Sequence, residues 1–88
     1  MTVAVEISMY PLSQEYEPPI IAFIQALKQA EGLQVATNEL STQVAGEYDL
    51  VMNSLRDTMK EAFEQTGTCS FVLKVLNVDI SPGTEVVF

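Results

Sequence analysis

The chain has 88 residues, of which 48% are hydrophobic, and its 12 acidic and 4 basic side chains give a formal net charge of −8. This length predicts a single domain over residues 1–88, and the hydrophobic fraction predicts a folded globule rather than a disordered tail. An acidic surface repels nucleic acid and anionic membranes, so it favours neutral or cationic partners.

The cysteine and histidine content limits the chemistry that the chain can perform. A single cysteine, Cys69, cannot form an internal disulfide, a CxxC redox pair or an all-cysteine metal site. Histidine, the commonest acid–base residue, is absent. No stretch approaches the ~18 apolar residues of a membrane span, and the opening MTVAVEIS lacks the basic leader of a signal peptide. We therefore expect a cytoplasmic protein with no metal and no cofactor.

The first expected element is a strand over residues 2–10, TVAVEISMY. Its residues alternate, so that one face holds Val3, Val5, Ile7 and Met9 and the other holds Ala4, Glu6, Ser8 and Tyr10. A period of two with β-branched residues indicates a strand with one fully apolar face. Pro11 is expected to end this strand, because proline cannot donate to a ladder of hydrogen bonds.

A helix is expected after the loop PLSQEYEPP. Pro18 and Pro19 suit the first turn of a helix, where their missing N–H groups cost little. Helical spacing then predicts an apolar stripe made of Ile20, Phe23, Ile24 and Leu27. Gly32 is placed to end the helix.

The second half of the chain predicts a hairpin, a helix and a last strand. LQVATNEL and STQVAGEY indicate a hairpin around residues 38–41, with Gly46 breaking its second strand. The next helix has Asp49 in its first turn, where a carboxylate suits the helix dipole, and ends at Gly67. Its apolar stripe is predicted to contain Leu50, Met52, Leu55, Met59, Ala62 and Phe63. CSFVLKVLNVDI predicts a final strand, and residues 81–88 a C-terminal tail.

The predicted order of elements is therefore β-α-β-β-α-β. The known solution for this order is the α+β ferredoxin-like fold, a four-stranded antiparallel sheet with two helices on one face. The last strand is apolar on both faces, with Val72, Leu76, Val78 and Ile80 on the second. Two helices cover only one face, so we expect the open face to be the interface of a homo-oligomer. The alternative is that Val72 and Leu76 lie under the C-terminal tail.

This fold hosts many functions, so the residues must decide among them. RNA-recognition domains need aromatic residues on the open face and a basic surface, but Tyr10 is the only aromatic on that side of the first strand. Metal chaperones and iron–sulfur ferredoxins need more cysteines. A phosphate-handling enzyme favours a glycine-rich loop or an arginine clamp, yet the single arginine, Arg56, lies within a helix. Asp57, Glu61 and Glu64 resemble a solvated helix face. We expect no enzyme activity.

Five polar residues are the candidate ligand-binding residues: Ser8, Tyr10, Asn38, Ser41 and Thr42. The first and third strands are neighbours in this topology, so these side chains are expected to converge on a small polar patch in apolar surroundings. Such a patch suits a small heteroaromatic ligand. A purely structural interpretation stays open for the hairpin residues, which are good turn or strand formers. Lys74 is expected to pair with Glu6 across neighbouring strands.

The ordered set of motifs resembles the YkoF-like thiamine- and hydroxymethylpyrimidine-binding family. The motifs are ISMYPL at residues 7–12, TNELSTQVAG at 37–46, a TG followed by SFVL at 66–73, and SPG near the end. The resemblance implies a ferredoxin-like domain that forms dimers or tetramers and binds thiamine or its pyrimidine precursor without catalysis. It also implies that Ser8 and Tyr10 match the strand-one pair of the family, and that Asn38, Ser41 and Thr42 match the polar part of the hairpin.

Two hypotheses follow from the sequence. The first is a small-molecule binding module for thiamine or hydroxymethylpyrimidine, in which hydroxyl and amide groups meet the donors and acceptors of an aminopyrimidine. The acidic protein would attract the cationic thiazolium, and Tyr10 would offer a cation–π contact. The second is a structural or regulatory oligomer with a vestigial pocket.

Overall fold

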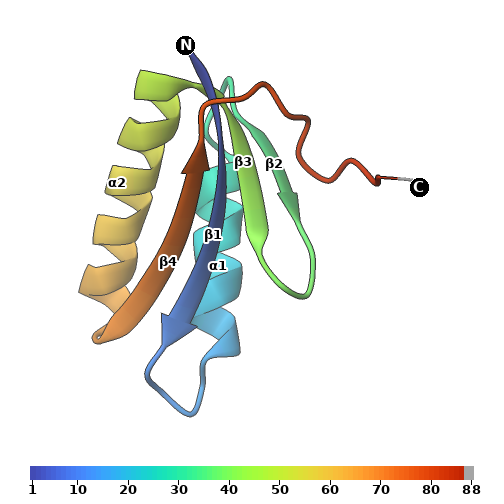
Figure 1. Cartoon of the computed structure of the whole chain (residues 1–88). Helices are drawn as coiled ribbons and strands as arrows, with labels where there is room; N and C mark the ends of the chain where they lie inside the picture. Colours follow the sequence, from blue (N-terminus) through green and yellow to red (C-terminus); the bar gives the residue numbers. More distant parts are fainter. Residues whose placement is uncertain (87–88) are drawn as a thin grey trace.

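The computed structural model describes residues 1–86 and confirms the ferredoxin-like fold. Four strands form one antiparallel sheet in the order β2-β3-β1-β4, and both helices lie on the same side of it (Figure 1). The elements in chain order are β1 (Thr2–Pro11), α1 (Glu17–Lys28), β2 (Gln34–Thr37), β3 (Thr42–Glu47), α2 (Tyr48–Thr66) and β4 (Cys69–Leu76). The last two residues of the predicted tail, 87 and 88, lie outside the described residues.

The core lies between the helices and the inward face of the sheet. The alternation predicted for β1 is confirmed, because Val3, Val5, Ile7 and Met9 are at most 6% exposed. The other fully buried large side chains are Leu27 of α1, Val44 of β3, and Val51 and Leu55 of α2. Phe71 of β4 packs its ring against Phe23 and Phe63, with ring centroids 5.0 and 5.4 Å away.

Several predicted boundaries were wrong. α1 ends at Lys28 rather than at Gly32, which adopts a left-handed turn (φ 83°) three residues beyond the C-cap Gln29. β4 ends at Leu76, so Val78 and Ile80 follow the strand instead of belonging to it. Gly46 does not break β3. The strand continues to Glu47.

Gly46 lets two other segments approach the sheet closely. It pairs with Val3 of β1. A Cβ at this position would lie 3.2 Å from the carbonyl oxygen of Gly32 and 3.3 Å from Val51 of α2. The missing side chain therefore serves packing rather than strand termination.

The ends of α2 follow the prediction, but its apolar stripe is shifted. Gly67 is the C-cap with φ 79°, and its N–H donates to the Phe63 carbonyl. Leu50 and Phe63 are 38% and 47% exposed, whereas the unpredicted Val51 is fully buried. Leu50, Val51 and Met52 are consecutive apolar residues, so the sequence alone does not show which of them faces the core. Packing of α2 against the sheet selects Val51.

The open face of the sheet carries both apolar and charged side chains. Glu6 and Lys74 face each other across β1 and β4, and their charged groups are 3.7 Å apart, which confirms the predicted pair. Val72 and Leu76 of β4 are 59% and 42% exposed. The described part of the tail leaves Val72 open to solvent, whereas Leu76 borders a hollow together with Ile80 and Pro82 of the tail, so the alternative was wrong for Val72.

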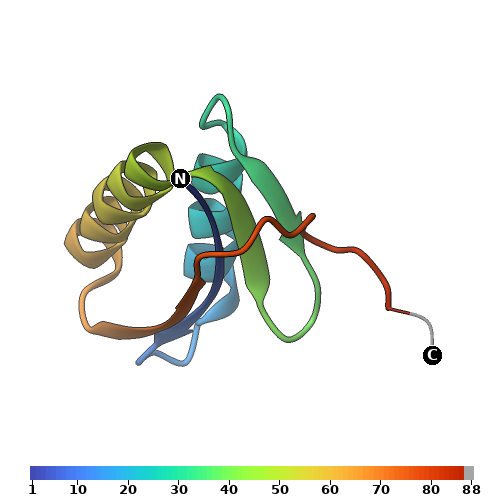
Figure 2. The ribbon, with the colours of Figure 1, turned by 45° about the horizontal axis from the view of Figure 1, so that its top comes forward.

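The chain after β4 crosses the open face toward β3 and β2 (Figure 2). Gly83 donates its N–H to the side-chain oxygen of Gln43 at 2.9 Å. A Cβ on Gly83 would lie 3.0 Å from the Cβ of Ala36, so the tail is in close contact with β2. Within residues 1–86, no helix combines the length and hydropathy needed to cross a membrane.

Strand β1 has two partners along only part of its length. Its pairing with β3 ends at Ile7, which lies opposite Thr42. Its pairing with β4 continues to Pro11, which lies opposite Cys69. Residues 8–11, here called the one-sided end of β1, therefore have a strand neighbour on one edge only.

Candidate functional site

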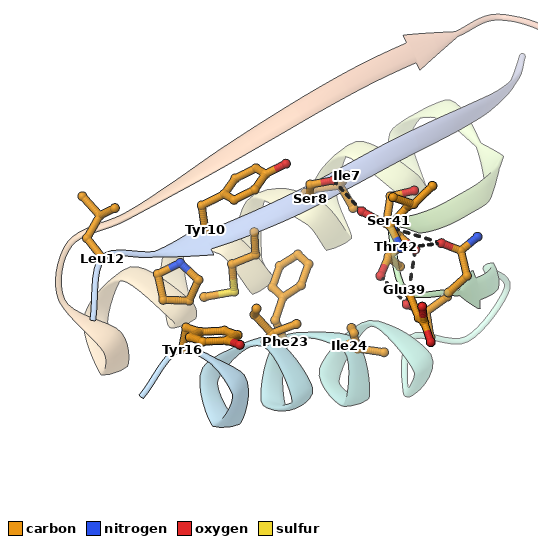
Figure 3. Close-up of a pocket in the computed structure, with 16 residues that line it drawn as sticks. Ile7, Ser8, Tyr10, Leu12, Tyr16, Phe23, Ile24, Glu39, Ser41 and Thr42 are labelled. Carbon is orange, nitrogen blue, oxygen red and sulfur yellow. Dashed lines mark hydrogen bonds between the residues drawn. The ribbon is translucent and has the colours of Figure 1, made fainter. Parts of the chain in front are cut away.

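A cavity of about 490 Å³ lies at the one-sided end of β1, between this end, α1 and the β2–β3 hairpin (Figure 3). Its apolar lining consists of Ile7, Met9, Pro11, Leu12, Ile20, Phe23, Ile24 and Leu40. Its polar lining consists of Ser8, Tyr10, Tyr16, Thr37, Asn38, Glu39, Ser41 and Thr42. A volume of ~300–1,000 Å³ is typical of small-molecule sites, and apolar walls with polar groups among them are a common feature of such sites.

The hairpin turn creates the cavity by closing before β3 can extend further along β1. Asn38 accepts hydrogen bonds through Oδ1 from the N–H groups of Leu40 and Ser41, at 2.8 and 3.1 Å. Its own N–H donates to the Ser41 carbonyl at 3.1 Å. This side-chain-stabilised turn places Thr42 as the first residue of β3, and the space that further strand pairing would fill stays open.

Thr37 and Thr42 form a hydroxyl pair on the helix side of the sheet. They are opposite each other in β2 and β3, and their Oγ1 atoms are 2.9 Å apart. Thr37 can also donate to the Ser41 carbonyl at 3.4 Å. Thr42 is only 4% exposed, and it belongs to the inner wall of the cavity. If Thr42 donates to Thr37, its oxygen keeps lone pairs that can accept a hydrogen bond.

Ser8, Tyr10 and Ser41 lie toward the opposite face of the sheet from Thr42. Ser8 and Tyr10 alternate with the inward-facing residues of β1, and Figure 3 shows both above the strand. Ser8 Oγ donates weakly to the Leu40 carbonyl at 3.5 Å, and Ser41 Oγ donates to Glu6 at 3.0 Å. The five predicted residues therefore border one cavity, but their side chains leave the sheet on both faces instead of converging on one patch.

Tyr16 and Glu39 are lining residues that the sequence did not single out. Tyr16 is the N-cap residue of α1, and Glu39 lies within the hairpin turn. Figure 3 places Tyr16 at the start of α1 and Glu39 on the hairpin side of the cavity. Their positions depend on how the loop and the turn fold over α1, although a tyrosine directly before a proline-led helix is visible in the sequence. Together with Tyr10 they add two phenol rings and one carboxylate to the lining.

Two ionisable groups with shifted pKa values lie outside the cavity lining. Backbone N–H donors at the start of α2, chiefly Leu50, lower the pKa of the Glu47 carboxyl, which caps that helix. Burial raises the pKa of the Cys69 thiol, which keeps it protonated at neutral pH. Within residues 1–86, no three His, Cys, Asp or Glu side chains gather closely enough to form a metal site.

Comparison with solved structures found the same fold in several organisms. A structural-genomics protein from Streptococcus pneumoniae superimposes with a TM-score of 0.83 at 21% identity, covering 91% of this chain and 90% of that one. A hypothetical protein from Methanocaldococcus jannaschii gives 0.74 at 21% identity, covering 96% and 84%. A Thermotoga maritima protein described as a "putative thiamine biosynthesis/salvage protein" gives 0.78 at 16% identity, covering 89% and 85%.

The likeness is one of fold. Comparisons with protein-family models and with curated proteins found no match.

Proposed function

We propose that the protein binds thiamine or its hydroxymethylpyrimidine moiety, without catalysis, in the cavity beside the one-sided end of β1. The observation that carries this proposal is the composition of the lining, which combines apolar side chains, two tyrosines, neutral hydroxyl and amide groups and one carboxylate. A thiazolium is a permanent cation that tyrosine rings attract. An aminopyrimidine has donors and acceptors that hydroxyl groups can satisfy. A protein of the same fold has a thiamine-related description.

Isothermal titration calorimetry with thiamine, hydroxymethylpyrimidine and an unrelated heterocycle tests this proposal directly. Ile24→Trp places a larger side chain on the α1 wall of the cavity, and we expect it to abolish binding. Ile21→Trp is the matched control, because Ile21 is on the same helix, 44% exposed and absent from the lining. Binding that survives equally in both variants would place the ligand elsewhere, and no heat with either ligand in the wild type would refute the proposed function.

Thr42→Val tests the inner wall of the cavity. Valine has a similar shape and favours strands, so the fold should be retained. We expect binding of hydroxymethylpyrimidine to weaken by about 1–3 kcal/mol, the typical cost of leaving a polar group unpaired. Glu6→Gln is the control, because Glu6 contacts Ser41 and Lys74 on the open face and does not line the cavity. Equal affinity of the wild type and Thr42→Val would remove this hydroxyl from the site.

A structural oligomer with a vestigial pocket is the second candidate function. It is favoured by hydrogen bonds that occupy Asn38 Oδ1 and the Ser41 hydroxyl within the protein. Val72 and Leu76 are exposed apolar side chains on either side of the Lys74–Glu6 pair on the open face, and they suit contact with a second copy of the chain in either case. Leu76→Asp would place an unpaired charge in that interface, so it should dissociate the oligomer in sedimentation analysis. A wild type that sediments as a monomer at micromolar concentration would refute the oligomer.

A further inference from the structure

Strand β4 has a hydrogen-bonding partner on only one of its two edges. It is the last strand of the sheet, and within residues 1–86 it pairs with β1 alone (Figure 1). The N–H of Leu12 donates to the Thr68 carbonyl at 3.1 Å, which continues the β1–β4 register by one hydrogen-bonded pair. Such pairs alternate along an antiparallel ladder, so every second residue of β4 bonds to β1. These residues are Ser70, Val72, Lys74 and Leu76.

The backbone groups of the intervening residues point away from the sheet. Phe71, Leu73 and Val75 therefore present N–H donors and C=O acceptors along the outer edge of β4. No loop within residues 1–86 bonds to these groups through its backbone. Backbone groups of this kind are a template for an added strand, because an extended segment can satisfy all of them at once.

An apolar strip, here called the edge strip, lies beside this edge on the helix side. Phe71 and Leu73 are packed against the core, whereas Val75 is 48% exposed. The ring of Phe63 on α2 contacts Phe71 and is 47% exposed. Met59 lies one turn before Phe63 on the same side of α2 and completes the edge strip. Methionine and aromatic side chains adapt readily to the side chains of a partner.

The edge strip contains no charged side chain. The nearby cations are held in ion pairs, since Lys74 pairs with Glu6 on the open face and Arg56 pairs with Asp57 on α2. Uncharged side chains of a partner are therefore the best match for the strip itself. The protein as a whole carries a charge of −8, which attracts basic segments over longer distances.

We propose that the outer edge of β4 is a docking site for an extended segment of a partner protein, which adds to the sheet as a fifth, antiparallel strand. The matching segment places uncharged, apolar side chains on the edge strip at alternate positions and has basic residues at its ends. Backbone hydrogen bonds supply the affinity, and the strip supplies the side-chain preference. The edge strip lines no part of the cavity, so this inference does not depend on the proposed function.

A synthetic peptide that alternates valine and threonine, with lysines at both ends, is the probe. We expect the amide protons of Phe71, Leu73 and Val75 to exchange quickly with solvent in the free protein and to become protected when the probe is added. The amides of Val72 and Lys74 bond to β1, so they should be protected in both states. Hydrogen exchange followed by NMR makes this comparison residue by residue.

N-methylated probes separate strand addition from simple hydrophobic contact. In an antiparallel addition, the residues whose side chains lie on the strip also direct their N–H groups to β4. Methylation of the valine amides should therefore weaken binding by at least ~10-fold relative to methylation of the threonine amides. Equal affinities, or the reverse order, would overturn the proposal.

Two variants of Val75 test the edge from the side of the protein. Val75→Pro removes one outward N–H without removing a bond to β1, and Val75→Ala is the matched control that keeps this N–H. We expect Val75→Pro to bind the probe about 10-fold more weakly than Val75→Ala. Equal affinities of the two variants would overturn the proposal. If Val75→Pro does not fold, the methylated probes decide the question on the wild type.

A second copy of the chain is the competing occupant of this edge. Protection of the outward amides that rises with protein concentration, without any probe, would assign the edge to self-association and overturn the proposal. Absence of binding at about 1 mM probe would also overturn it. Glutamates in place of the lysines should weaken binding at low ionic strength, and equal affinity of the two probes would contradict the preference for basic ends.

Discussion

The two ends of β1 belong to one strand but differ in strand pairing and in what they border: one end lies in the middle of the sheet, and the other lines the cavity. The first part, from Thr2 to Ile7, pairs with β3 throughout and with β4 from Ala4 onward, and it buries three side chains that are at most 2% exposed. The one-sided end, residues 8–11, pairs only with β4 and borders the cavity. The alternation of buried and less buried residues continues through both parts, so the difference in strand pairing comes from where β3 begins. A turn of four residues thus makes the end of a central strand the wall of a cavity.

The largest expected effect separates the two parts at adjacent residues. Ile7→Ala removes buried methyl groups from the doubly paired part, and we expect it to lower the free energy of unfolding by about 2–5 kcal/mol. Ser8→Ala, one residue further on and directed to the open face, should change it by less than ~0.5 kcal/mol. Urea denaturation of both variants measures the free energy of unfolding. Equal decreases in the two variants would mean that the two parts of β1 contribute alike to stability.

A smaller loss is expected when side-chain volume is added opposite the first part of β1. Gly46→Ala places a methyl group 3.2 Å from the Gly32 carbonyl oxygen and 3.3 Å from Val51. Overpacking of this kind typically costs ~1–3 kcal/mol. Thermal unfolding followed by circular dichroism would detect it. A neutral result would show that the turn at residues 32–33 moves aside easily.

The turn that limits β3 can be weakened without touching the core. Asn38→Ala removes the Oδ1 acceptor used by Leu40 and Ser41, and we expect a loss of about 1 kcal/mol. Asn38→Asp keeps an acceptor at this position, so its stability should be close to that of the wild type. Chemical denaturation of the two variants compares them. If both variants lose the same stability, the side-chain oxygen is not what holds the turn.

The smallest effect concerns pH and lies at the start of α2. Backbone donors lower the folded-state pKa of Glu47, so its contribution is present above the unfolded pKa of about 4.3 and is lost as the pH falls through the lower folded value. Glu47→Gln should therefore remove part of the acid sensitivity of the melting temperature. Melting curves recorded between neutral and acidic pH test this, and parallel curves for the two proteins would contradict it.

The sequence was sufficient to predict the fold but only the outline of the site. The alternation in β1, the proline-led start of α1 and the Glu6–Lys74 pair depend on local patterns, and all three are confirmed. The faces of Ser8 and Thr42 depend on the register of β1 against β3, which is set by the turn and by packing. Tyr16 and Glu39 reach the cavity only through the path of their loops over α1. Long-range geometry of this kind leaves no periodic signal in a sequence.

Strand β4 also bears on how the protein stays dispersed. It is one of the two outer strands of the sheet, and its eight residues, CSFVLKVL, contain a single charged side chain. Uncharged, β-branched segments on an outer strand readily template aggregation with other chains. Lys74, besides pairing with Glu6, is therefore the gatekeeper of this edge. Its loss would affect colloidal behaviour more than folding, because its side chain is 77% exposed and contributes little to the core.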